Sequence, residues 1–135
     1  MTGPASAVAK PSIQAGDTIF IPSGNSGEHL FVVVAGIRIV DRKRMILLAP
    51  IETFVAKSET SCLLNPGDHT FVKHASHIGY RHCRVEDMEH LEACIGAGYY
   101  RVNVDPVSST VLQKIREGYR LSNRVPRYIK REWAI

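Results

Sequence analysis

The sequence predicts a mainly β fold with added helices: a small antiparallel, strongly bent sheet or barrel whose helices come late in the chain. Two observations predict this fold. Short apolar segments recur at hairpin spacing over residues 16–85, with turn signals between them and no crossover helices. After residue 86 the apolar residues recur every three or four positions, which is typical of amphipathic helices.

The chain has 135 residues, which suits a single domain. Residues 1–15 are rich in Ala, Ser and Pro, so we expect a flexible N-terminal arm before one domain at 16–135. The arm has no apolar core of signal-peptide length, and no stretch approaches the ~20 apolar residues of a membrane span. The three cysteines lack CxxC spacing and predict no disulfide framework. We therefore expect a cytoplasmic protein without membrane contact.

The first expected strand, 16–24, places Ile19 and Ile21 on one face, and a turn follows at 25–28. The β-branched run at 29–40 indicates a long buried strand, with Gly36 as a candidate bulge.

The DRKR sequence at 41–44 turns the chain into another buried strand at 45–55, which we expect Pro50 to interrupt. A short strand at 58–64 and the NPGD turn at 65–68 follow. Two further strands are expected at 69–74 and 77–85.

The helices come last. Residues 86–98 predict a short amphipathic helix that ends at Gly96 or Gly98. A C-terminal helical segment spans about 105–133. Its first helix has Asp105 or Ser108 as its cap and Gly118 as its end, and Pro126 begins a further turn.

The net charge of +4 is mild, but the cations cluster. The C-terminal segment carries Lys114, Arg116, Arg120, Arg124, Arg127, Lys130 and Arg131. Such a cluster suits a nucleic-acid surface, and it equally suits a solvated helix face.

Four of the six histidines lie within residues 65–85, at His69, His74, His77 and His82. Metal binding, acid–base chemistry on an anionic substrate and a solvated hairpin are the three explanations. The metal explanation is the weakest, because the spacing lacks helical i, i+4 pairs and no acidic residue lies between His69 and His82. We therefore predict neither a metal nor a cofactor.

The order of the segments resembles the MazF/PemK (Kid-like) family of bacterial toxins. The similarity rests on "GDTI" at 16–19, "HLFVVV" at 29–34, "ILLAPIET" at 46–53 and "SHIGYRHCRVEDMEHL" at 76–91. It implies an SH3-like barrel, a homodimer and a metal-independent endoribonuclease that cuts single-stranded RNA and is silenced by a cognate antitoxin. CcdB-like members share the fold and act on a protein target.

The chain departs from the family at two site positions. The family's usual catalytic Arg precedes the second strand, where His29 stands here, and either Glu52 or Thr53 occupies the place of its usual Thr or Ser. An imidazole that titrates near neutrality thus replaces a permanent cation.

Cleaving RNA through its own 2′-hydroxyl needs a base, an acid and a cation that stabilises the phosphate. If 77–85 is a strand, His77 and Arg81 share a face. Our hypothesis places these two residues in a groove with His29 and Thr53 as the catalytic group. We interpret His82, beside Cys83, as a packing or hydrogen-bonding residue.

RNA binding is assigned to cations, a histidine and a ring that can stack a base. The assigned residues are Lys73, His74, Tyr80, Arg120, Arg124 and Arg127. Tyr80 and the aromatic residues of the tail can instead pack in the core.

Two other functions stay open at this point. One is a non-catalytic module of the same fold that binds nucleic acid or a protein, which His29 favours. The other is a CcdB-like toxin with a protein target.

Overall fold

The computed structural model describes residues 13–24 and 27–135. Most of the predicted N-terminal arm, 1–12, therefore lies outside the described residues. Of its last three residues, Ile13 is buried. The turn predicted at 25–28 is described only at Gly27 and Glu28, and Glu28 already begins a strand.

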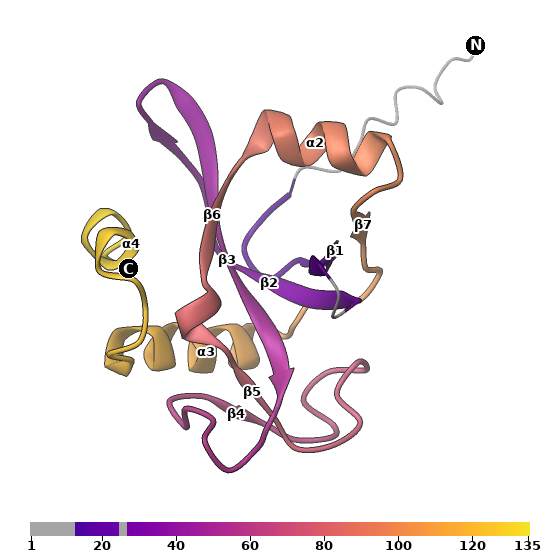
Figure 1. Ribbon diagram of the computed structural model, residues 1–135, viewed down its shortest axis with the longest axis vertical. Coiled ribbons are helices and arrows are strands. Elements are labelled where there is room, and N and C mark those ends of the chain that lie inside the picture. Colours follow the sequence, from indigo (N-terminus) through magenta and orange to yellow (C-terminus); the bar gives the residue numbers. More distant parts are fainter. Residues whose placement is uncertain (1–12, 25–26) are drawn as a thin grey trace.

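The described chain is mainly antiparallel sheet with three α-helices, which confirms the predicted class (Figure 1). The strands are β1 (Thr18–Pro22), β2 (Glu28–Val40), β3 (Lys43–Thr53), β4 (Leu63–Leu64), β5 (Ser76–Ile78), β6 (Arg84–Asp87) and β7 (Arg101–Val102). They form an open sheet in the order β4-β5-β3-β2-β1-β7, and β6 pairs with β3 off this path. A 3-10 turn, η2 (Tyr80–His82), separates β5 from β6. The short β7 was not predicted.

The sheet separates two apolar clusters, because successive side chains of a strand point to opposite faces. On β2, Leu30 and Val32 belong to the larger cluster, whereas Phe31 and Val33 belong to the smaller one. The larger cluster includes residues of α3 (Ser109–Leu121) and α4 (Arg127–Glu132). The smaller one includes Leu91 of α2 (Met88–Gly96). Figure 1 shows α2 at the top of the view and α3 across its lower middle, with the sheet between them.

Strand β3 is the centre of the sheet. One edge pairs with β2 along most of its length, with register shifts around Ala35 that agree with the bulge predicted near Gly36. The other edge pairs first with β6 at residues 45–48 and then with β5 at residues 51–53. The predicted interruption at Pro50 is wrong: β3 is continuous there. Pro50 pairs with Phe31, and its carbonyl accepts a hydrogen bond from Gly79 N at 3.0 Å.

Two of the predicted strands are wrong. Residues 69–74 form turns, and the ring of His69 contacts the Asp105 carbonyl at 2.6 Å instead of facing a strand neighbour. Residues 77–85 do not form one strand, because the pairing of β5 with β3 ends at Ile78 and the chain then forms η2. There Tyr80 turns into the core and its hydroxyl donates to the Ile115 carbonyl at 2.6 Å. The strand predicted at 58–64 is reduced to Leu63–Leu64.

The helices follow the sequence more closely. The Asp87 side chain caps α2 by accepting from Glu89 N at 2.8 Å, and Ser108 caps α3 by accepting from Val111 N at 3.1 Å. Gly118 does not end α3, because the helix continues to Leu121, and Gly118 is buried against Tyr80, Ser61 and Cys62. Pro126 is the residue just before α4 rather than its first residue.

No helix within the described ranges has both the length and the apolar character that crossing a membrane requires.

Candidate functional site

The alternation of β2 and β3 brings polar side chains to one face of the sheet. His29 and Phe31 of β2 share a face with Pro50 and Glu52 of β3, since Phe31 pairs with Pro50. These four residues line a hollow of about 400 Å³ together with Ser23, His82 and Arg84. We call it the His29 hollow.

Glu52 contacts two imidazoles. Its Oε2 lies 2.7 Å from Nδ1 of His82, and its Oε1 lies 3.4 Å from Nε2 of His77. Glu52 and His77 face each other across the β3–β5 ladder, whereas His82 arrives from η2. A carboxylate can only accept a hydrogen bond, so it places a proton on Nδ1 of His82 and leaves Nε2 as the second ring nitrogen. The His82 side chain is 54% exposed, so this ring can meet a ligand.

Gly79 makes this arrangement possible. A Cβ on Gly79 would lie 2.5 Å from Oε1 of Glu52, which is too close for any real contact. The carboxylate therefore lies directly over the bare backbone of Gly79, at the point where β5 ends and η2 begins. A close backbone approach of this kind requires glycine.

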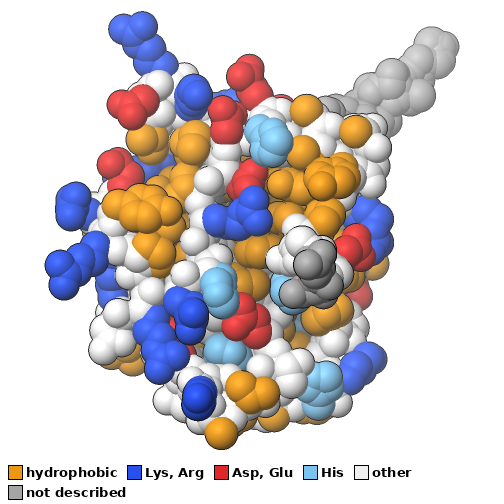
Figure 2. Space-filling model, in the orientation of Figure 1, with side chains coloured by type: hydrophobic (Ala, Val, Ile, Leu, Met, Phe, Trp, Pro, Cys, Tyr) orange, Lys and Arg blue, Asp and Glu red, His pale blue; other side chains and the backbone are white. Residues whose placement is uncertain are grey.

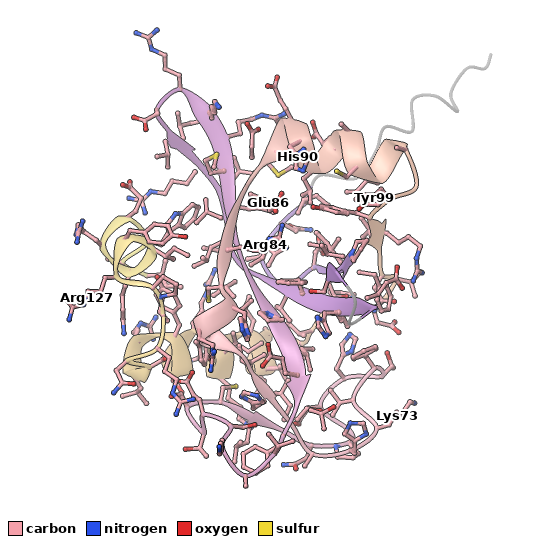
Figure 3. All side chains as sticks on the ribbon, viewed as in Figure 1. Lys73, Arg84, Glu86, His90, Tyr99 and Arg127 are labelled. Carbon is pink, nitrogen blue, oxygen red and sulfur yellow. The ribbon has the colours of Figure 1, made fainter. Side chains whose placement is uncertain are left out.

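Arg84 is held in place at the edge of the His29 hollow. Its Nη2 lies 2.7 Å from Oε2 of the buried Glu86, and its guanidinium carbon lies 5.5 Å from the centre of the Phe31 ring. Figure 3 shows Arg84 and Glu86 together along β6. A guanidinium fixed by a carboxylate and a ring is preorganised to meet an anion.

A second hollow of about 180 Å³ adjoins the first, and Glu52 and His82 line both. We call it the Arg81 hollow. Its exposed cations are Lys57, Arg81 and Arg124, and buried His77 and Glu59 also line it. Figure 2 shows histidine and acidic side chains on this face, with Lys and Arg beside them.

The structure separates the four residues predicted to be catalytic. His29 lines the His29 hollow, while His77 and Arg81 line the Arg81 hollow. Arg81 and His77 do not share a strand face as expected, since η2 intervenes and His77 is only 5% exposed. Thr53 lines neither hollow: it is the last residue of β3, and its Oγ1 lies 3.0 Å from Nε2 of His74.

The residues predicted to bind RNA are also dispersed. Tyr80 is wholly buried, so the prediction that it stacks a base is wrong. Arg124 lines the Arg81 hollow, whereas Arg120 donates to the Ile135 carbonyl at 2.8 Å. Lys73 and Arg127 lie on opposite sides of the molecule, in the loop before β5 and on α4 (Figure 3).

Sequence reasoning missed three residues of the site. His82 was interpreted as a packing residue because Cys83 follows it, and Cys83 is indeed buried. The 3-10 turn reverses the expected alternation and exposes His82. Glu52 was one of two alternatives at its position, and Arg84 was not assigned. The alternation of β3 is the signal that points to Glu52, because its neighbour Ile51 is buried.

Cys62 and Cys83 are not suited to act as nucleophiles at neutral pH. Burial raises the pKa of the Cys62 thiol to about 11 and that of Cys83 to about 12. Both are therefore neutral thiols near pH 7. The described residues also contain no group of three or more His, Cys, Asp or Glu side chains arranged to hold a metal ion.

The full sequence matches no model of a known protein family and no curated protein.

Proposed function

We propose that the protein is a metal-independent endoribonuclease that cleaves single-stranded RNA in the His29 hollow. The observation that carries this proposal is the pair of histidines, His29 and His82, in one open hollow with Arg84. Two imidazoles and a fixed cation are the groups that cleavage through the 2′-hydroxyl requires.

Each group has a role in one balanced step. His82 Nε2 takes the proton of the 2′-hydroxyl, and the 2′-oxygen forms a bond to phosphorus. The bond from phosphorus to the 5′-oxygen breaks, and His29 gives that oxygen a proton. Arg84 stabilises the charge on the phosphate. The products are a 2′,3′-cyclic phosphate and a 5′-hydroxyl.

Glu52 acts as a positioning residue. Its 2.7 Å contact with Nδ1 of His82 fixes the ring orientation and the tautomer in which Nε2 is free to accept a proton. Phe31 and Pro50 give the hollow an apolar floor on which a ribose or base can rest.

The resemblance to the MazF/PemK family supports the same function. We infer that the open antiparallel sheet is a divergent form of the SH3-like barrel of that family, since the segments that carry the resemblance form β1, β2, β3 and the stretch from β5 to α2, in that order. A homodimer, a cognate antitoxin and cytoplasmic location belong to this proposal. Sedimentation of the purified protein, and a search for a short acidic protein encoded next to it, test them.

The second candidate is a non-catalytic binding module, which the His at position 29 favours because the family has Arg there. Such a module would bind RNA without cutting it. A CcdB-like toxin with a protein target would arrest growth without RNA decay.

The deciding experiment is cleavage of a long single-stranded RNA in EDTA by purified protein, with mapping of the ends. We expect cuts at a recurring short sequence with 2′,3′-cyclic phosphate ends. His82→Ala and His29→Ala should each lower the rate by about 10²-fold or more, because each removes a proton-transfer group.

His90→Ala is the matched control. His90 lies on α2 and lines neither hollow (Figure 3). The His90→Ala variant should therefore cleave RNA like the unchanged protein. Intact RNA with salt-sensitive binding would replace the nuclease by the binding module. Equal losses in all three variants would show that the His29 hollow is not the site.

A further inference from the structure

The Arg81 hollow has a rim and a floor of opposite character. Lys57 comes from the β3–β4 loop, Arg81 from η2 and Arg124 from the α3–α4 loop, and all three are exposed. Among the described residues none of the three forms an ion pair with an acidic side chain. Three elements far apart in the sequence thus bring free positive charge to one rim.

The floor carries a buried acidic side chain. Glu59 is 7% exposed, and its Oε2 already accepts from the hydroxyls of Ser61 and Ser122. Within residues 13–24 and 27–135, neither Oε1 of Glu59 nor Nδ1 of His77 has a hydrogen-bond partner. With the carboxylate of Glu52 also present, the floor repels a small anion that enters the hollow of about 180 Å³.

An anion that stays on the rim suits these charges, and a polymer backbone is such an anion. A phosphodiester that lies across the hollow meets the cations and avoids the carboxylates. The two hollows meet at Glu52 and His82, so a strand whose scissile phosphate lies in the His29 hollow continues directly onto this rim.

We propose that Lys57, Arg81 and Arg124 bind the backbone phosphate next to the scissile one, so that the substrate is an RNA strand that extends past the cleaved bond on this side. This inference rests on the proposed endoribonuclease. It makes the rim a binding site separate from the groups that move protons.

Substrate length tests the inference. For the unchanged protein, one nucleotide is added to either the 5′ or the 3′ end of a dinucleoside monophosphate. The addition at the end that continues over the Arg81 hollow should raise kcat/KM by about tenfold, which corresponds to about 1.4 kcal/mol of added binding. The double variant Lys57→Gln, Arg124→Gln should lose most of that gain, measured relative to its own rate on the dinucleoside monophosphate. Lys114→Gln, which removes an exposed cation that lines neither hollow, should keep it.

A binding assay separates this inference from the proposed reaction. An all-deoxy single strand of ten nucleotides cannot be cut through a 2′-hydroxyl, so its affinity is measured whether or not the protein is a nuclease. The double variant should bind it about tenfold more weakly, and the slope of log K against log salt should fall by roughly one per lost contact.

Three results are decisive. Weaker binding and a lost length gain support the rim site. Weaker binding in a protein that never cuts RNA keeps the rim as a strand-binding site and removes the nuclease. Unchanged binding and an unchanged length gain in the double variant overturn the inference even if RNA is cleaved.

Discussion

At the scale of single residues, the site depends on one carboxylate that lies over a glycine. Glu52 pairs with His77 across the ladder, and its carboxylate occupies the space that a side chain at position 79 would fill. With any residue other than glycine there, Glu52 would have to move. His77, on the ladder, is buried, whereas His82, on the turn, is exposed. Two histidines five positions apart thus differ in access to a ligand, and the difference is the reverse of the one that the sequence predicts.

Gly79→Ala should disable the site without unfolding the protein. The new methyl group would lie 2.5 Å from Oε1 of Glu52, so the carboxylate must move away from His82. We expect RNA cleavage to fall by about 10- to 100-fold, the usual effect of misplacing a catalytic group by about an ångström.

Gly96→Ala is the control, because a Cβ there meets nothing within 4 Å. The rate of each variant and its thermal unfolding temperature are the measurements. Full activity of Gly79→Ala would show that the Glu52 contact does not position His82.

The cysteines should differ in reactivity. Cys62 and Cys83 are buried and their thiol pKa values are raised to about 11 and about 12, whereas Cys94 on α2 is only half-buried. In folded protein at pH 7.5 we expect iodoacetamide to modify Cys94 first and the other two only after urea is added. Peptide mass mapping over time checks this order, and early modification of Cys62 would contradict the burial described here.

At the scale of elements, the sequence predicted those segments whose side chains follow one period throughout. The long strands at 28–40 and 43–53 and the helices at 88–96 and 109–121 have such a period. The segment after Asn65 does not, because Tyr80 hydrogen-bonds to α3 and His69 to the Asp105 carbonyl. Both partners come more than thirty residues later, so local pattern could not reveal that the chain turns there.

The candidate site was predictable in the same uneven way. His29 lies on a strand whose alternation could be followed in the sequence, and it lines the His29 hollow, whereas its predicted partners Thr53, His77 and Arg81 do not. His82 is exposed because it lies in η2, and His77 is buried where β5 pairs with β4. The alternation of side chains along a strand predicts neither the turn nor this pairing.

The packing of α3 against Ser61 and Tyr80 at Gly118 should be sensitive to a single added methyl group. A Cβ on Gly118 would lie 2.8 Å from the Ser61 carbonyl oxygen and would also collide with the buried Tyr80 hydroxyl. Replacing glycine by alanine favours a helix by about 1 kcal/mol, but overpacking costs about 1–3 kcal/mol. We expect Gly118→Ala to lower the free energy of unfolding.

Urea unfolding monitored by circular dichroism measures this change, and Gly96→Ala again provides the comparison at an open helix position. A stabilised Gly118→Ala protein would mean that α3 does not pack against Ser61 as described.

At the scale of the whole molecule, the buried thiols and phenols link stability to alkaline pH. Burial raises the pKa of Cys62 from 9.0 to about 11, and that of Tyr119 from 10.0 to about 12. These groups keep their protons in the folded state at a pH where the unfolded chain has lost them. Their contribution to stability is therefore complete below pH 9 and declines as the pH rises toward the folded values.

We expect the free energy of unfolding to fall by about 1.4 kcal/mol per pH unit for each such group, between pH 9 and pH 11 for Cys62 and between pH 10 and pH 12 for Tyr119. Urea titrations at half-unit intervals of pH measure the slope. Cys62→Ala removes one of the groups and should make the slope shallower. A flat profile in the unchanged protein would contradict the burial of these side chains.

The late position of α3 and α4 in the chain has a consequence for the protein during its synthesis. Both long strands, η2 and the groups of the His29 hollow are complete once residue 84 has left the ribosome. The partner of the Tyr80 hydroxyl, Ile115, and the aromatic ring of Trp133 emerge only afterwards. A nascent chain therefore carries the chemistry of the site before it has the cover that makes its sheet stable. Chaperones that bind exposed apolar surface have their longest opportunity in the interval between these two events.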